Sequence, residues 1–143
     1  MSQFITLNTI IGNGKSYQVP IYQRDYSWDK DDWEDLWNDI AEIPNDKTHY
    51  LGYLVLQPLQ EGEESFWIID GQQRLTTLSI LILAVTAVLK KWAQEGVNTE
   101  DNTIRYEKIT ERYLGNYSLS KLNLDPKLKL NRNNDDYYKS WLL

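Results

Sequence analysis

The stretch that decides the fold of this chain is Ile68-Ile69-Asp70-Gly71-Gln72-Gln73-Arg74-Leu75-Thr76-Thr77-Leu78. The residues that lead into it, from Phe66 onward, are apolar and mostly aromatic or β-branched, which is typical of a strand. An Asp-Gly pair then predicts a turn, and the apolar residues after it recur at helical spacing. Backbone N–H groups at a helix start point toward a ligand, and the helix dipole favours negative charge there. The stretch therefore indicates an anion site.

The same residues also fit a capping box. In that interpretation Asp70 accepts from the backbone N–H of Gln73, and the Gln73 side chain reaches back to the cap. Arg74 argues for a ligand, because a cation in the first helical turn is disfavoured by the dipole unless an anion binds beside it. Gly71 would let a ligand approach the backbone closely, and Thr77 adds a hydroxyl one turn on. The two interpretations remain open, and both can hold at once.

Composition limits the class of protein. The 143 residues suffice for a single domain over 1–143, with 41% apolar and 13% aromatic residues to supply a core. There is no cysteine, so disulfides, Cys-based zinc sites and thiol nucleophiles are excluded. The net charge of −6 argues against nucleic-acid binding that is driven by attraction between the overall protein charge and the phosphates, although a local basic pocket stays possible.

The two ends of the chain carry expectations about its context. The N-terminus lacks the basic and apolar regions of a signal peptide, and the longest apolar run, Leu78–Leu89, is shorter than the roughly 20 residues of a membrane span. We therefore expect a cytoplasmic protein with no membrane partner. The residues from Asp135 to Leu143 predict a helix that stops without a cap, so we expect the N-terminal fragment of a longer chain.

Periodicity and turn residues predict the remaining elements. Residues 4–11 fit a short helix or strand with Thr6 or Asn8 as a cap, and 16–19 fit a strand. Asp29 fits the N-cap of a helix that ends near Pro44, with an apolar face made of Trp33, Leu36, Trp37 and Ile40. Further along, the pattern predicts strands at 50–57 and 65–69 that form a hairpin, followed by a helix at 73–94 that is buried because it is apolar on nearly all sides. A second helix is predicted at 100–114, with Ile104, Ile109, Tyr113 and Leu114 inward. The rest of the chain fits an extended segment or hairpin at 118–130 and a terminal helix capped by Asn133 or Asn134.

A second candidate patch is the pair Gln23-Arg24. Alone it fits an exposed loop with Arg24 stacked on Tyr22 or Tyr26. Arginine also binds phosphate in a bidentate manner, and two Gln-Arg pairs at strand-to-helix junctions are suited to converge on one phosphate group. His49 is the sole histidine; a strand-edge position without a catalytic task is favoured over a general base.

Three segments together resemble a known family. Val19–Trp28, with its Tyr-Gln-Arg-x-Tyr-x-Trp run, is similar to the family's first motif, Tyr50–Gly52 to its middle strand, and Ile69–Leu78 to its signature. The chain is identified on these motifs as a member of the DGQQR-motif domains, related to the ParB and sulfiredoxin-like fold. These domains lie at the N-terminus of GmrSD-type modification-dependent restriction proteins. The resemblance covers residues 4–92 well and the rest loosely.

The resemblance implies an α+β fold in which a small mixed sheet packs against a buried central helix, with extra C-terminal helices. It implies binding and hydrolysis of a nucleoside triphosphate with Mg²⁺, coupled in phage defence to cleavage of modified DNA by a nuclease domain or subunit absent from this sequence. When the family's functional residues are carried over by position, the catalytic residues are Asp70 and Arg74, and Asp70 either holds Mg²⁺ or orients water. The residues that bind the nucleotide are then Gln23, Arg24, Gly71, Gln72, Gln73 and Thr77. No Walker-type loop is present, which excludes P-loop chemistry. The alternative is a non-catalytic DNA-sensing or protein-interaction module of the same fold.

Overall fold

The computed structural model describes residues 5–12, 14–45, 47, 50–60, 64–117 and 124–142. Its helices are α1 (Leu7–Ile11), α2 (Lys30–Ala41), α3 (Gln72–Gln94), α4 (Thr99–Ile109) and α5 (Arg132–Leu142), and a π-helical turn, η1 (Thr110–Leu114), extends α4. Its strands are β1 (Ser16–Gln18), β2 (Val55–Pro58), β3 (Ser65–Asp70), β4 (Gly115–Tyr117), β5 (Leu124–Pro126) and β6 (Leu128–Lys129). The predicted α+β class is confirmed.

The main sheet is mixed, with the strand order β2-β3-β1-β6. Strands β2 and β3 form the predicted antiparallel hairpin, whereas β1 lies parallel to both β3 and β6. Tyr17 at the centre of β1 is opposite Phe66 on one side and Leu128 on the other. The described part of 118–130 is extended but does not pair with itself, because β5 pairs with β4 and β6 joins the main sheet.

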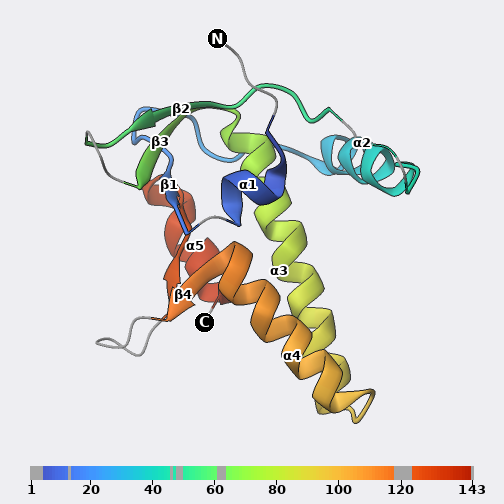
Figure 1. Ribbon diagram of the computed structural model, residues 1–143. Coiled ribbons are helices and arrows are strands. Elements are labelled where there is room, and N and C mark those ends of the chain that lie inside the picture. The colour runs from blue at the N-terminus through green and yellow to red at the C-terminus, as the bar shows by residue number, and fades with distance from the viewer. Residues whose placement is uncertain are drawn as a thin grey trace.

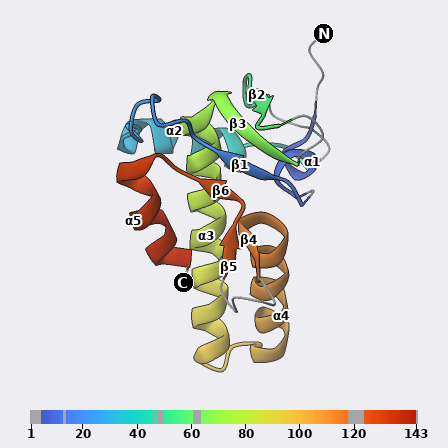
Figure 2. The same cartoon turned by 90° about the vertical axis from the view of Figure 1, so that its left-hand side faces the viewer.

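Helix α3 is the element on which the others are arranged. The sheet lies at its N-terminal end, α4 runs beside its C-terminal half, and α5 flanks it on the side opposite α4 (Figures 1 and 2). The core is formed by side chains from both ends of the chain and from the sheet: Ile11, Tyr17, Val19, Ile68, Leu75, Leu128, Leu130 and Tyr138. This core fixes the start of α3, where the signature residues lie.

The prediction that this helix is buried on all sides is wrong for its second half. Leu75, Leu78 and their neighbours in the first two turns are buried, but Val85, Val88 and Trp92 are 44–47% exposed. The reason is that α3 extends beyond the sheet and packs there against α4 (Figure 1). By length and composition alone α3 would also suffice to cross a membrane, a test that core helices of soluble proteins pass too.

The two N-terminal helices form as their caps predict. Thr6 caps α1 by accepting from the backbone N–H of Thr9, which decides between helix and strand. Asp29 and Asp32 form a reciprocal capping box at α2. The predicted apolar face of α2 is mostly not buried, because α2 projects away from the sheet beside the N-terminal part of α3 (Figure 1). Trp33 and Trp37 are accordingly 47% and 57% exposed.

Two further boundaries and the burial of one residue differ from the prediction. The strand expected over 50–57 begins only at Val55, because Gly52 has a φ of +101° that a regular strand does not accommodate. The residue Ile104, expected inward, is 50% exposed, although Leu114 is fully buried. Helix α5 begins at Arg132, so Asn133 and Asn134 lie inside it rather than at its cap.

Candidate functional site

The segment that carries the first Gln-Arg pair lies against the junction of β3 and α3. Gln23 donates from Nε2 to the backbone carbonyl of Ile69 at 3.0 Å. Gln72 in turn donates from Nε2 to Oε1 of Gln23 at 3.3 Å. The structure therefore brings together the two motifs that are separated by about fifty residues in the sequence.

Gln73 binds the same segment from inside the fold. Its Oε1 accepts from the backbone N–H of Ser27 at 2.8 Å, and its Nε2 donates to the carbonyl of Asp25 at 3.2 Å. The side chain is therefore not available to reach back to the helix start. The capping-box interpretation is wrong: the cap is Gly71, with a φ of +93° and no side-chain cap bond, and Asp70 accepts from the adjacent N–H of Gly71 through Oδ1 at 2.9 Å.

A chain of hydrogen bonds joins this segment to α2. The indole Nε1 of Trp33 donates to the hydroxyl of Tyr26 at 2.6 Å, and the Thr77 hydroxyl donates to the carbonyl of Gln73 at 2.8 Å. The Tyr26 and Thr77 hydroxyls are 2.6 Å apart. Because the Thr77 proton is already used, Tyr26 must donate to Thr77. Thr77, predicted to bind nucleotide, is thus a buried structural acceptor in this conformation.

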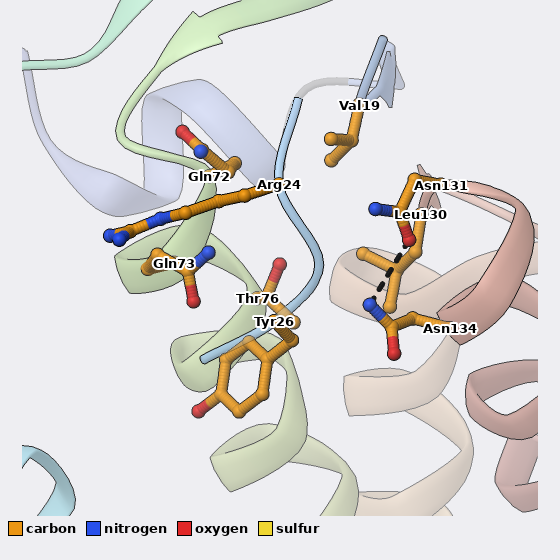
Figure 3. A pocket seen from close by; sticks show the side chains of 9 residues that line it. All are labelled: Val19, Arg24, Tyr26, Gln72, Gln73, Thr76, Leu130, Asn131 and Asn134. Atoms are coloured by element: carbon orange, nitrogen blue, oxygen red, sulfur yellow. Dashed lines mark hydrogen bonds between the residues drawn. The ribbon is translucent and has the colours of Figure 1, made fainter. Parts of the chain in front are cut away.

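Asn131 brings the C-terminal part of the chain to the site. Its Nδ2 donates to the Asp25 carboxylate at 2.7 Å and to the Gln23 carbonyl at 3.4 Å. Its Oδ1 accepts from Nδ2 of Asn134 at 3.0 Å (Figure 3). Sequence reasoning missed both asparagines. The only signal was a polar pair at a strand-to-helix junction, which also fits a simple cap.

The two arginines of the motifs take no part in the hydrogen bonds described above. Arg24 is exposed and extends between Gln72 and Gln73 (Figure 3). The guanidinium of Arg74 is half-buried against the backbone of Gly52, where a Cβ atom would collide with Nη1. Neither arginine makes a hydrogen bond or ion pair with any residue that the structure describes. Within the described part of the chain, neither guanidinium group has a partner that an anion would have to displace.

The space between these residues is small. A cavity of about 10 Å³, the room that one water molecule needs, is lined by Val19, Arg24, Tyr26, Gln72, Gln73, Thr76, Leu130, Asn131 and Asn134 (Figure 3). A phosphate group is larger than this. In this conformation the cavity does not admit one unless the Arg24 side chain moves.

Asp70 is the acidic residue of the signature stretch. It is exposed, and only Oδ1 has a hydrogen-bond partner among the described residues. In the described ranges no group of three or more His, Asp or Glu side chains gathers to hold a metal. A lone carboxylate still fits Mg²⁺ that is bound mainly through substrate phosphates and water.

His49 lies outside the described residues, so its two interpretations stay open.

These features define an α+β domain with two glutamine-arginine motifs joined at the start of a central helix. The family described as "GmrSD restriction endonuclease, N-terminal domain" matches residues 7–141, and the chain belongs to this family. It is therefore a component of a restriction system. The resemblance inferred from the motifs is confirmed, and the match also includes the C-terminal helices.

A short segment of the chain is similar to other proteins. It is 35% identical over 66 residues to tuftelin-interacting protein 11 from Sus scrofa and to the same protein from Homo sapiens. The matched segment covers 46% of this chain but spans only 8% of the length of those relatives. Such a local likeness does not define a shared fold or activity.

Proposed function

We propose that this domain binds a nucleoside triphosphate at the two Gln-Arg motifs and hydrolyses it, as the regulatory part of a restriction system. The nuclease that cleaves modified DNA would be a separate domain or subunit. One observation carries the proposal: Arg24 and Arg74 have no acidic partner among the described residues, although the chain carries a net charge of −6. Unpaired arginines at a helix N-terminus are suited to phosphate.

The chemistry follows from the positions of these groups. A water molecule attacks the γ-phosphorus, the bond from that phosphorus to the β–γ bridging oxygen breaks, and the products are nucleoside diphosphate and phosphate. Arg74 stabilises the negative charge that develops during transfer. Asp70 either orients the water or holds Mg²⁺ together with the phosphates. The glutamines join the two motifs that carry Arg24 and Arg74, since Gln23 and Gln72 are hydrogen-bonded directly.

Binding requires Arg24 to move. Because the cavity beside it measures about 10 Å³, the phosphates enter only when this side chain swings outward and then closes over them. The movement costs little, because Arg24 is exposed and has no partner to leave among the described residues. Gly71 itself is packed against the chain before β2, since a Cβ atom there would lie 2.9 Å from Leu54 Cδ1 and 3.0 Å from the Tyr53 carbonyl oxygen.

The test is phosphate release by the full-length protein with Mg²⁺ and each of the four nucleoside triphosphates. Arg74→Ala should lower the rate by about a hundredfold or more, because it removes a charge contact to the transferred group. Arg24→Ala should mainly raise KM. Lys90→Ala, which removes an exposed cation on α3 away from the motifs, is the matched control and should leave the rate unchanged. Equal rates in wild type and both arginine variants would overturn the proposal.

A second candidate is a non-catalytic module that senses modified DNA or binds a protein. It is favoured by the exposure of the residues just before Gln23, since Ile21 is 85% and Tyr22 is 77% exposed. Exposed apolar and aromatic groups beside a polar site are common at binding surfaces. Binding of modified DNA that does not depend on nucleotide, in a protein that releases no phosphate, would favour this candidate.

A further inference from the structure

A second group of cations gathers on a different part of the molecule. A groove of about 420 Å³ is lined by Gly12, Gly14, Lys108, Glu111, Arg112 and Lys127. These residues come from the segment after α1, the end of α4 with η1, and the turn between β5 and β6. None of them belongs to the two Gln-Arg motifs. Three cations and one carboxylate give the groove a net charge of about +2 on an acidic chain.

Lys127 is the buried member of the group. Only 6% of the residue is exposed, and Nζ donates to the carbonyl of Ile11 at 3.0 Å. Its other two N–H groups have no partner among the described residues. Burial, and secondarily the charge of Arg112, lowers the pKa of Lys127. A buried ammonium beside a second cation is unfavourable unless an anion compensates it.

Arg112 faces the groove from η1. The guanidinium lies 5.7 Å from the ring centre of Tyr113 and makes no hydrogen bond or ion pair with the residues described. Gly12 leaves room for it, because a Cβ atom at this position would lie 3.2 Å from Arg112 Nε and 2.5 Å from the carbonyl oxygen of Asn8. At the rim, Lys108 Nζ lies 4.0 Å from Glu111 Oε2, and both side chains are exposed. An exposed pair at this distance leaves Lys108 available to a ligand.

We propose that this groove is a second anion site and that it binds a small phosphate-bearing molecule. Its volume is within the range of small-molecule sites. Arg112 and Lys108 supply exposed charge-assisted donors, and Lys127 supplies a fixed charge at the bottom. A concave site with a buried lysine suits a compact phosphate group better than a DNA duplex, which needs a long surface of exposed cations.

The test is titration calorimetry with inorganic pyrophosphate at low ionic strength. The full-length protein carries Arg24→Ala and Arg74→Ala, so that the proposed nucleotide site does not contribute. In this background Arg112→Gln should weaken pyrophosphate binding by about tenfold. Glu111→Gln should tighten it several-fold, because this change removes the carboxylate that repels an anion in the groove. Lys90→Gln, which removes an exposed cation elsewhere, should change the affinity less than about twofold.

All three substitutions are at exposed positions, so each variant should fold. Equal weakening by Arg112→Gln and Lys90→Gln, or weakening by Glu111→Gln, would overturn the proposal. So would the absence of pyrophosphate binding, or binding of a DNA duplex alone. The background protein lacks both motif arginines, so a negative calorimetry result would not contradict the proposed nucleotide hydrolysis. In the same way, a protein that releases no phosphate from nucleotides would not contradict the anion site in the groove.

Discussion

Gln73 shows how one side chain holds the site together. Both ends of its amide bind the backbone of the segment 25–27, and the residue is 7% exposed. Replacing it with alanine removes both bonds to the part-buried N–H of Ser27 and carbonyl of Asp25. Gln73→Ala should therefore lower the free energy of unfolding by about 1–3 kcal/mol, measured by urea denaturation. Gln72→Ala, which loses one longer hydrogen bond, is the control and should cost less than about 1 kcal/mol.

Tyr138 gives a prediction about alkaline pH. Its hydroxyl is buried near Ser79 and has no hydrogen bond among the described residues. Burial raises the pKa of Tyr138 to about 12, and Ser79 opposes the shift. Below pH 10 the phenol is neutral in both states and contributes no pH dependence. Between about pH 10 and 12 the unfolded chain loses this proton first, so the folded state becomes less stable as the pH rises.

The comparison with Tyr138→Phe isolates that effect. Near pH 8 the variant should be as stable as the wild type or more stable by up to about 1 kcal/mol, because it lacks the unpaired hydroxyl. At pH 11 the free energy of unfolding of the variant should exceed that of the wild type by about 1 kcal/mol more than at pH 8, since a shift of one pKa unit corresponds to about 1.4 kcal/mol. The same difference in urea midpoint at both pH values would contradict the assigned environment.

Single residues were predictable where the chemistry is local. Asp29 was identified as a cap from its neighbours, and the structure bears this out. Asp70 and Gln73 have the same spacing, yet they form no cap, because Gln73 meets Asp25 and Ser27 instead. Nothing near Gln73 in the sequence indicates those distant partners.

Among the elements, the turn at Gly52 controls the position of Arg74. An alanine there would meet both an unfavourable φ of +101° and the guanidinium of Arg74. The guanidinium is the flexible partner and should move. We expect Gly52→Ala to weaken nucleotide binding by about tenfold or more, measured by titration calorimetry, at a stability cost of about 1–2 kcal/mol.

Gly96 offers a matched control for that substitution. Its φ is +83°, and a Cβ atom there would meet nothing within 4 Å. Gly96→Ala should therefore carry a similar backbone strain without touching Arg74. If the two alanine variants lose stability and nucleotide affinity to the same extent, the strain of the backbone and not the displacement of Arg74 explains the effect.

Helices with regular periodicity were predicted well, as α2 and α3 show, although of these two only α2 has the predicted cap. The same periodicity did not tell which faces are covered. Trp33 and Trp37 repeat as a core face would, but no element of the described structure buries them. Likewise Gly52 breaks a strand that its apolar neighbours indicate, since its left-handed backbone is not visible in a pattern of polarity.

At the scale of the whole molecule, the sheet depends on contacts that local patterns do not encode. Strand β1 is parallel to β6, so that Tyr17 is opposite Leu128. The α+β class was available from the resemblance, whereas this pairing was not. Composition likewise conceals local charge: a chain with a net charge of −6 contains a groove with Lys108, Arg112 and Lys127.

The decisive measurement is titration calorimetry of the full-length protein with each nucleoside triphosphate and Mg²⁺, comparing wild type with Arg74→Ala. If the paired motifs form a triphosphate site, the wild type binds at least one nucleotide and Arg74→Ala binds it about tenfold or more weakly while remaining folded. Lys90→Ala should bind like the wild type. Equal affinity of the wild type and a folded Arg74→Ala variant for every nucleotide would contradict the assignment of the site.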